Sequence, residues 1–410
     1  MSEKKLEIMA PAGNFECLNA AIQGGANSVY FGIGKLNMRS HSANNFAPED
    51  LEEVCRICRE AGVKSYLTLN IIVYNEDLEE MREALRSATK AGVSAVIASD
   101  MAVIMYARQL GIEVHISTQL SISNSESLRF YAQFADVIVL ARELTLVQVK
   151  EIKAIIDADH ICGPSGRLLE IEIFCHGALC MAVSGKCYLS LHEYNASANR
   201  GSCFQLCRRG YEVTDLETGN QLLVDNNYIM SPRDLCTIEF MDKIIDAGVT
   251  VFKIEGRARS SEYVKTVARA YRDAADAVQA GQYTPQLAAS LKERLSTVFN
   301  RGFWDGYYMG ARLGQWSEVY GNRATRTKEY IGKITNYFEK IGVAEVLIET
   351  KELSVGDSIL ITGPTTGVYE GTVEEIRLDL KPVGKVVKGD LCSIPIKTKL
   401  RRSDRLYTFK

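Results

Sequence analysis

Residues 169–190, LEIEIFCHGALCMAVSGKCYLS, join an apolar β-strand to the start of a cysteine-rich segment. Seven further runs of strand character lie at residues 6–12, 27–34, 64–70, 94–99, 113–119, 136–142 and 250–256. Amphipathic helical stretches separate these runs. Eight strands that alternate with helices over about 270 residues predict a (β/α)8 barrel of the TIM type. A doubly wound open sheet is the alternative.

The cysteine-rich segment follows the seventh predicted strand and covers residues 175–236. In a (β/α)8 barrel, this loop lies at the C-terminal face, where active sites are built. An insertion of roughly 60 residues is far longer than an ordinary βα loop, and long ordered loops tend to be functional. The sequence therefore predicts the functional site beside this insertion.

Four cysteines of the segment follow the spacing C-x6-C-x15-C-x3-C, namely Cys180, Cys187, Cys203 and Cys207. Such crowding without a secretory signal indicates metal or cluster ligation rather than disulfides. Thiolates suit an iron–sulfur cluster or zinc. Only the last pair has the short spacing that is typical of structural zinc sites, which favours a cluster and leaves zinc as the alternative. Cys236 is the alternative to Cys207 as the fourth ligand.

Polar side chains alternate with apolar ones along three predicted strands, so the polar set is expected to face the barrel lumen. Burying polar groups costs several kcal/mol unless they are paired, and a barrel mouth rich in them indicates a binding site. Arg257 and Arg259, just past the eighth strand, are suited to hold a carboxylate or phosphate. The candidate catalytic residues are Glu255, Lys253 and His115, and the candidate substrate-binding residues are Asn70, Gln119, Arg257 and Arg259.

The sequence predicts three regions. Residues 1–275 form the barrel with its cysteine-rich segment, and residues 276–325 form a bridging helical and aromatic region. From residue 326 to 410, short strands separated by turn residues predict a small antiparallel β-barrel domain.

Composition places the chain among ordinary globular proteins, with 46% hydrophobic and 24% charged residues. The start, MSEKKLEIMAPAG, lacks the apolar run of a signal peptide, and no stretch is long enough to span a membrane. We therefore expect a cytoplasmic protein. The net charge of −3 provides no general attraction to nucleic acid, so any such contact must be local.

The motif at residues 172–190 resembles that of peptidase family U32, the collagenase-like group. The family pattern is E-x-F-x-x-G-[SA]-[LIVM]-C-x4-G-x-C-x-[LIVM]-S, and this chain fills every fixed position. The likeness continues through MAPAGN, NRGSCFQLCR, YIMSPRDLC, KIEGRARS and FNRGFWDGY, and covers essentially the whole chain.

Within the family, the chain is most similar to the tRNA wobble-uridine hydroxylation proteins, which make 5-hydroxyuridine in a prephenate-dependent pathway. The resemblance implies a 4Fe–4S cluster on the four spaced cysteines, tRNA and a small dicarboxylate such as prephenate as substrates, and a family-related protein partner. The lumen residues would then hold a flipped-out base or the dicarboxylate. The family's older name implies the alternative of a collagenase-like peptidase. A non-catalytic iron–sulfur partner of a hydroxylase complex is the third interpretation.

Overall fold

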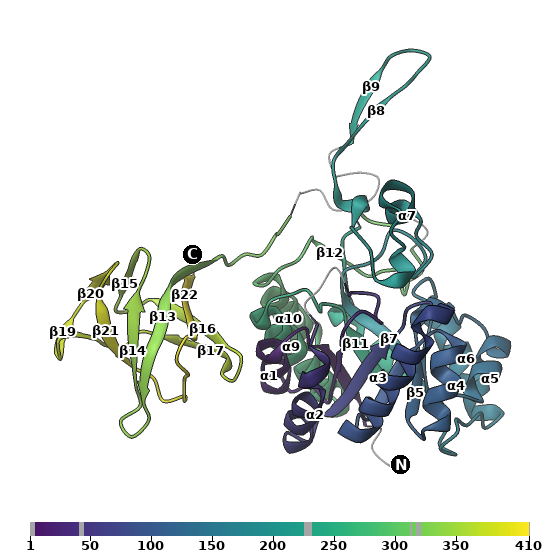
Figure 1. The fold of residues 1–410 in the computed structure, drawn as a ribbon. Helices are drawn as coiled ribbons and strands as arrows, with labels where there is room; N and C mark the ends of the chain where they lie inside the picture. The colour runs from purple at the N-terminus through teal and green to yellow at the C-terminus, as the bar shows by residue number, and fades with distance from the viewer. Residues whose placement is uncertain (1–4, 41–44, 225–231, 312–313, 317–320, 410) are drawn as a thin grey trace.

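The computed structural model describes residues 5–40, 45–224, 232–311, 314–316 and 321–409. Within these ranges, eight parallel strands form a closed barrel, because β11 pairs with both β1 and β7 (Figure 1). This closure confirms the (β/α)8 barrel and excludes the open sheet. The barrel strands are β1 (Glu7–Pro11), β2 (Ser28–Phe31), β3 (Lys64–Leu69), β4 (Ala95–Ala98), β5 (Glu113–Ile116), β6 (Val137–Val139), β7 (Glu170–Gly177) and β11 (Val251–Ile254).

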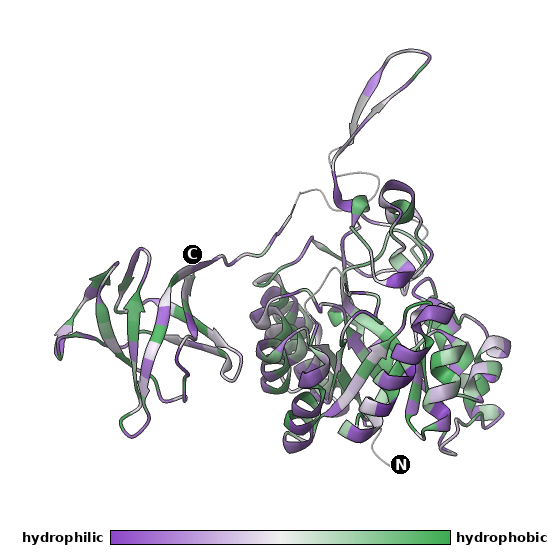
Figure 2. Cartoon of the chain, in the orientation of Figure 1, coloured by the Kyte–Doolittle hydropathy of each residue, from purple (hydrophilic) through white to green (hydrophobic). Residues whose placement is uncertain are grey.

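Amphipathic helices surround the barrel, with apolar faces toward the strands and charged faces outward (Figure 2). Gly92 ends α3 in the left-handed region at φ 76°, as the Ala-Gly pattern before the next strand predicts. These helices are α1 (Phe15–Gln23), α2 (Leu51–Glu60), α3 (Leu78–Ala91), α4 (Met101–Gln109), α5 (Ser125–Ala132), α6 (Leu146–Ala158), α8 (Met241–Asp246), α9 (Ser261–Gln279) and α10 (Pro285–Ser296). Because α9 runs through residue 275, the barrel region extends beyond the expected boundary.

Strand alternation divides the barrel side chains into two sets. Phe252 and Ile254 belong to the large core between strands and helices. A separate apolar cluster that includes Tyr30, Tyr66 and Ile97 fills the lumen. Tyr66 therefore points into the lumen.

The cysteine-rich segment lies over the C-terminal ends of the barrel strands (Figure 1). It contains α7 (Leu189–Tyr194) and a hairpin of β8 (Tyr211–Thr214) and β9 (Gln221–Val224) that projects away from the barrel. The chain then returns as β10 (Asp234–Cys236), which pairs antiparallel with β7. From the bridging region, β12 (Phe303–Trp304) adds to β10, and Trp304 is buried in the main core.

The C-terminal region is antiparallel, as predicted, and has its own apolar core. Eight strands of its main sheet follow the order β17-β16-β22-β13-β14-β21-β18-β19 in the described residues, and β15 pairs with β20 beside them. The strands are β13 (Lys328–Phe338), β14 (Val343–Ile348), β15 (Glu352–Ser354), β16 (Ser358–Gly363), β17 (Gly367–Thr372), β18 (Ile376–Leu378), β19 (Lys381–Val383), β20 (Lys385–Val387), β21 (Leu391–Pro395) and β22 (Arg405–Phe409). Among the described residues, no helix has both the length and the apolar character needed to cross a membrane.

Candidate functional site

A cavity of about 660 Å³ lies between the C-terminal ends of the barrel strands and the cysteine-rich segment. This volume is in the range of small-molecule and cofactor sites. All four spaced cysteines line the cavity, and so do six of the seven barrel residues predicted from the sequence: Asn70, Gln119, Lys253, Glu255, Arg257 and Arg259. The seventh, His115, does not line it.

Lys253 reaches the cavity from β11 and is held by a buried carboxylate. Its Nζ donates to Glu172 Oε1 at 2.7 Å, and it stands 4.9 Å from the ring centroid of Tyr30. Glu172 also faces His115, whose Nδ1 is 3.6 Å from Glu172 Oε2. His115 thus lies deeper in the lumen and reaches the cavity only through Glu172 and Lys253.

The environment sets the charges of this buried triad. Burial raises the pKa of Glu172, but Lys253 and His115 outweigh it and hold the pKa below its usual range. Burial lowers the pKa of His115, but hydrogen bonds with Glu113 and Glu172 outweigh it and raise the pKa to about 9. At neutral pH, His115 is therefore cationic.

Glu255 faces the cavity and pairs with Arg39, a residue of the loop after β2. Arg39 Nη2 lies 2.8 Å from Glu255 Oε1. Burial acts to raise the pKa of Glu255, and the charges of Arg39, Arg142 and Arg257 lower it below the ordinary value. An ionised Glu255 is therefore a hydrogen-bond acceptor, and a base only when a substrate displaces Arg39.

Asn70 and Gln119 form one amide pair at the cavity wall. Asn70 Nδ2 donates to Gln119 Oε1 at 2.9 Å, and Gln119 Nε2 donates to the main-chain carbonyl of Asn70 at 2.6 Å. Ser117 Oγ also donates to Gln119 Oε1, at 2.7 Å. The predicted substrate-binding amides are thus fixed in position by each other.

Guanidinium groups give the cavity an excess of positive charge. Arg257 Nη1 donates to Asn37 Oδ1 at 2.9 Å and to Thr68 Oγ1 at 3.1 Å, both of them neutral groups. Burial lowers the pKa of Arg257 to about 10, which leaves it charged at neutral pH. Arg142 and Arg259 stack on aromatic rings, and neither has a carboxylate within ion-pair distance in the described part of the chain. An anionic ligand would supply the missing negative charge.

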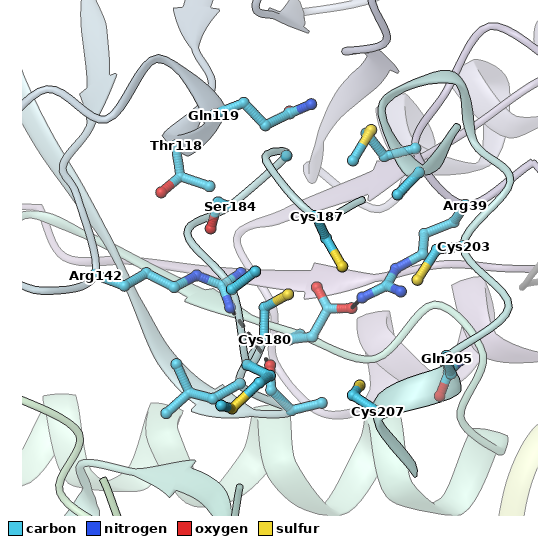
Figure 3. Close-up of a pocket in the computed structure, with 18 of the residues that line it drawn as sticks. Arg39, Thr118, Gln119, Arg142, Cys180, Ser184, Cys187, Cys203, Gln205 and Cys207 are labelled. Atoms are coloured by element: carbon cyan, nitrogen blue, oxygen red, sulfur yellow. Dashed lines mark hydrogen bonds and ion pairs between the residues drawn. The ribbon is translucent and has the colours of Figure 1, made fainter. Parts of the chain in front are cut away.

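The four spaced cysteines surround one end of the cavity, with Cys203 beside Arg39 (Figure 3). All of them are free thiols. Burial raises the pKa of Cys207, Arg208 lowers it, and the other three cysteines raise it. Cys236 is instead buried on β10, 4.0 Å from the Tyr271 hydroxyl, and does not line the cavity. Cys207, and not Cys236, therefore shares the cavity with the other three spaced cysteines.

The donor set suits an iron–sulfur cluster in its chemistry. In the described residues, no three His, Cys, Asp or Glu side chains are placed so that they could hold one metal ion. A single zinc ion requires every sulfur at about 2.3 Å from one centre. A four-iron cluster bonds each thiolate to a different iron, so its ligands stand farther apart. Four thiols around a shared cavity fit the cluster better than zinc.

Sequence reasoning missed three residues of the site. Arg39 and Arg142 reach the cavity from the loops after β2 and β6. In a loop, strand periodicity does not predict which way a side chain points. Glu172 is the first residue of the family motif, and alternation along β7 places it on the same face as Phe174, which lines the cavity. Of the three, only Arg142 lies just past the C-terminal end of a barrel strand, where barrel active sites are built.

A closed barrel with a charged, thiol-lined cavity at this end has the arrangement of an enzyme active site. Residues 13–318 match Peptidase family U32, and the chain belongs to this family.

Similar proteins carry two kinds of name. A collagenase of Porphyromonas gingivalis is 59% identical over 100% of this chain and 99% of its own length. The tRNA hydroxylation protein P1 of Bacillus subtilis is 33% identical over 91% of this chain and 87% of its own length. A 23S rRNA 5-hydroxycytidine synthase of Escherichia coli is 31% identical, over 92% of this chain and 55% of its own length. The relatives' names therefore divide between proteolysis and RNA hydroxylation.

Proposed function

We propose that this protein is an iron–sulfur tRNA hydroxylation factor that converts wobble uridine to 5-hydroxyuridine in the cytoplasm. The observation that carries the proposal is that four cysteines of one spacing motif and the cationic barrel mouth line the same cavity. A peptidase has no evident use for four free thiols around its substrate site. The names of the hydroxylation relatives support the choice of RNA.

In this proposal, Cys180, Cys187, Cys203 and Cys207 hold a 4Fe–4S cluster, which supplies electron transfer when bound. Arg142, Arg257 and Arg259 bind the carboxylates of a small dicarboxylate, with prephenate as the proposed co-substrate. The amide pair of Asn70 and Gln119 matches the hydrogen-bonding edge of a uracil base, which offers both donors and acceptors. Lys253 contributes a fixed positive charge beside the reacting groups.

The second candidate is a collagenase-like peptidase, which the name of the 59% identical relative favours. Serine and cysteine peptidases need a nucleophile that is hydrogen-bonded to a base. Among the described residues, no Ser, Thr or Cys side chain hydrogen-bonds to a histidine ring. The peptidase candidate therefore lacks an identified nucleophile.

The decisive experiment combines cofactor analysis with tRNA mass spectrometry. The protein is purified without oxygen and assayed for iron, sulfide and visible absorption. A strain that lacks the gene is complemented with each variant, and mass spectrometry measures 5-hydroxyuridine in its tRNA. We expect Cys180→Ser, Cys187→Ser, Cys203→Ser and Cys207→Ser each to lose iron and 5-hydroxyuridine. Cys162→Ser, a change outside the cavity, and Cys236→Ser should retain both.

Three outcomes would overturn the proposal. A normal level of 5-hydroxyuridine in the cysteine variants would show that hydroxylation does not need a cluster on these cysteines. Stoichiometric zinc with no sulfide would replace the cluster by zinc. Gelatin cleavage by metal-free protein, abolished by Glu255→Gln, would establish the peptidase instead.

A further inference from the structure

The cysteine-rich segment exposes aromatic side chains at or close in sequence to residues that line the cavity. Tyr188, Tyr194 and Phe204, which we name the aromatic rim, are 74%, 46% and 48% exposed. Across the described residues, six of the 21 exposed large hydrophobic side chains fall within residues 181–204. A patch this concentrated marks an interaction surface.

Local contacts hold the aromatic rim in place. The rings of Tyr194 and Phe204 pack edge to face with centroids 5.3 Å apart. The Phe204 amide donates to Ser190 Oγ at 3.0 Å, which ties the loop to α7. Tyr188, at the beginning of α7, also lines the cavity. The aromatic rim therefore continues the cavity wall outward as a preformed platform.

The charge around the aromatic rim is positive. Residues 180–210 contain four basic side chains and one acidic side chain, Glu193, and one of the basic side chains, Arg200, pairs with Asp77. Arg209 donates to the Tyr194 hydroxyl at 2.6 Å, with its guanidinium 5.5 Å from the ring centroid. Lys186 lines the cavity entrance. Aromatic rings interleaved with cations are typical of surfaces that stack bases and contact the phosphate backbone of single strands.

We propose that the aromatic rim binds the unpaired nucleotides of an RNA loop next to the base that enters the cavity. Tyr188 stacks on the nucleotide at the entrance, and the pair of Tyr194 and Phe204 stacks on a neighbour. Arg209 and Lys186 contact the intervening phosphates. A paired RNA helix would not fit this role, because its bases present no free face. The inference rests on the proposed function for the choice of RNA, and binding tests it separately from chemistry.

The test is fluorescence anisotropy with the full-length, anaerobically purified protein and two labelled RNAs. One RNA is an anticodon stem-loop, and the other is a fully paired duplex with the same number of phosphates. We expect tighter binding of the stem-loop. Tyr188→Ala and Tyr194→Ala should each weaken stem-loop binding about 5- to 100-fold, and Tyr188→Phe and Tyr194→Phe should stay within about twofold, because the ring is retained. The control Phe130→Ala removes an equally exposed ring on α5 and should have no effect.

Thermal melting and iron content show whether each variant keeps its fold and cofactor. Equal binding of duplex and stem-loop, or unchanged binding by both alanine variants, would overturn the inference. Competition by collagen-like peptide at the same concentration as RNA would assign the aromatic rim to polypeptide instead. Rim-dependent binding by a protein that leaves tRNA unhydroxylated supports this inference and rejects the proposed function. A normal KM for tRNA in hydroxylation by the alanine variants supports the proposed function and rejects this inference.

Discussion

Glu172 is a fully buried carboxylate in the barrel lumen, and its stability depends on two cations. Lys253 lies 2.7 Å away and His115 lies 3.6 Å away. Removing one partner of a buried ion pair leaves an uncompensated charge, which typically costs more than the pair contributes. Two predictions follow from this geometry.

The first prediction concerns Lys253. We expect Lys253→Met to lower the free energy of unfolding by about 3 kcal/mol, because the fully buried Glu172 then loses its closest cation. Lys64→Met is the matched control. Lys64 also makes a 2.8 Å pair with a glutamate, Glu7, but its side chain is 47% exposed, so its loss should cost less than about 1 kcal/mol. Urea unfolding at pH 7 measures both, and equal losses would show that Glu172 is neutral or hydrated.

The second prediction concerns pH. The folded pKa of His115, about 9, exceeds the unfolded value of 6.5. Its contribution to stability is therefore fully present below pH 6.5 and disappears as the pH rises through 9. The shift corresponds to about 3 kcal/mol. The difference in unfolding free energy between the protein and His115→Gln should be largest at pH 6 and vanish near pH 10. A pH-independent difference for His115→Gln would contradict the ion pair.

At the scale of elements, a side-chain latch joins the cysteine-rich segment to the barrel. Arg200 Nη1 donates to Asp77 Oδ2 at 2.6 Å and to the Ile72 carbonyl at 3.1 Å, and its guanidinium lies 3.8 Å from the Tyr74 ring centroid. The Ile72 amide in turn donates to the Asn199 carbonyl at 3.1 Å. The loop after β3 thus holds the segment that carries the thiols over the cavity.

We therefore expect Arg200→Ala to accelerate chymotrypsin cleavage within residues 180–210 about 5- to 100-fold, because opening of the segment requires less free energy. Arg200→Lys should be intermediate, since an ammonium cannot make the same fork of hydrogen bonds. Lys35→Ala removes only the exposed pair with Glu80 nearby and should leave the rate unchanged. Mass spectrometry of early fragments locates the cuts. Equal rates for Arg200→Ala and Lys35→Ala would show that other contacts hold the segment.

The barrel strands could be predicted from the sequence better than the loops and short strands that join them. Alternation along β11 places Lys253 in the lumen and Phe252 toward the helices, and the structure confirms both directions. The antiparallel return through β10 was not predicted, because a three-residue strand carries too little periodicity to be recognised. The pairing of Glu255 with Arg39 was also missed, since a loop residue 216 positions away is placed by tertiary packing alone. The local sequence pattern therefore predicts which way side chains point from a strand. The ion pairs that set the charge of the site depend on contacts between residues far apart in the sequence.

At the scale of the whole molecule, the C-terminal domain is joined to the barrel by specific contacts as well as by the chain (Figure 1). Leu360 and Val368 belong to the main barrel core rather than to the core of their own domain. Gln23 of α1 donates to the Thr366 carbonyl at 2.8 Å and accepts from the Val368 amide at 2.9 Å. Lys265 of α9 donates to the Val368 carbonyl at 2.9 Å. The turn between β16 and β17 therefore docks the domain.

Gly367 at this turn provides a sharp test of the docking. Its φ is +65°, and an added Cβ would lie 2.7 Å from Gln23 Oε1, so Gly367→Ala must displace the amide that makes both docking hydrogen bonds. Gly342→Ala carries the same left-handed strain at φ +63°, but its Cβ meets nothing closer than 3.6 Å. The strain costs both variants about 1 kcal/mol, and lost hydrogen bonds should cost Gly367→Ala about 2 kcal/mol more.

Because the additional loss falls on the contact between the domains, calorimetry of Gly367→Ala should resolve two unfolding transitions, and Gly342→Ala should keep the original profile with a lower Tm. Adding Gln23→Ala to Gly367→Ala should cost almost nothing further, since one amide accounts for both effects. If the two glycine variants lose equal stability and their transitions stay alike, the turn carries no docking energy. The domains would then be coupled through other contacts, such as the packing of Leu360, and through the linking chain.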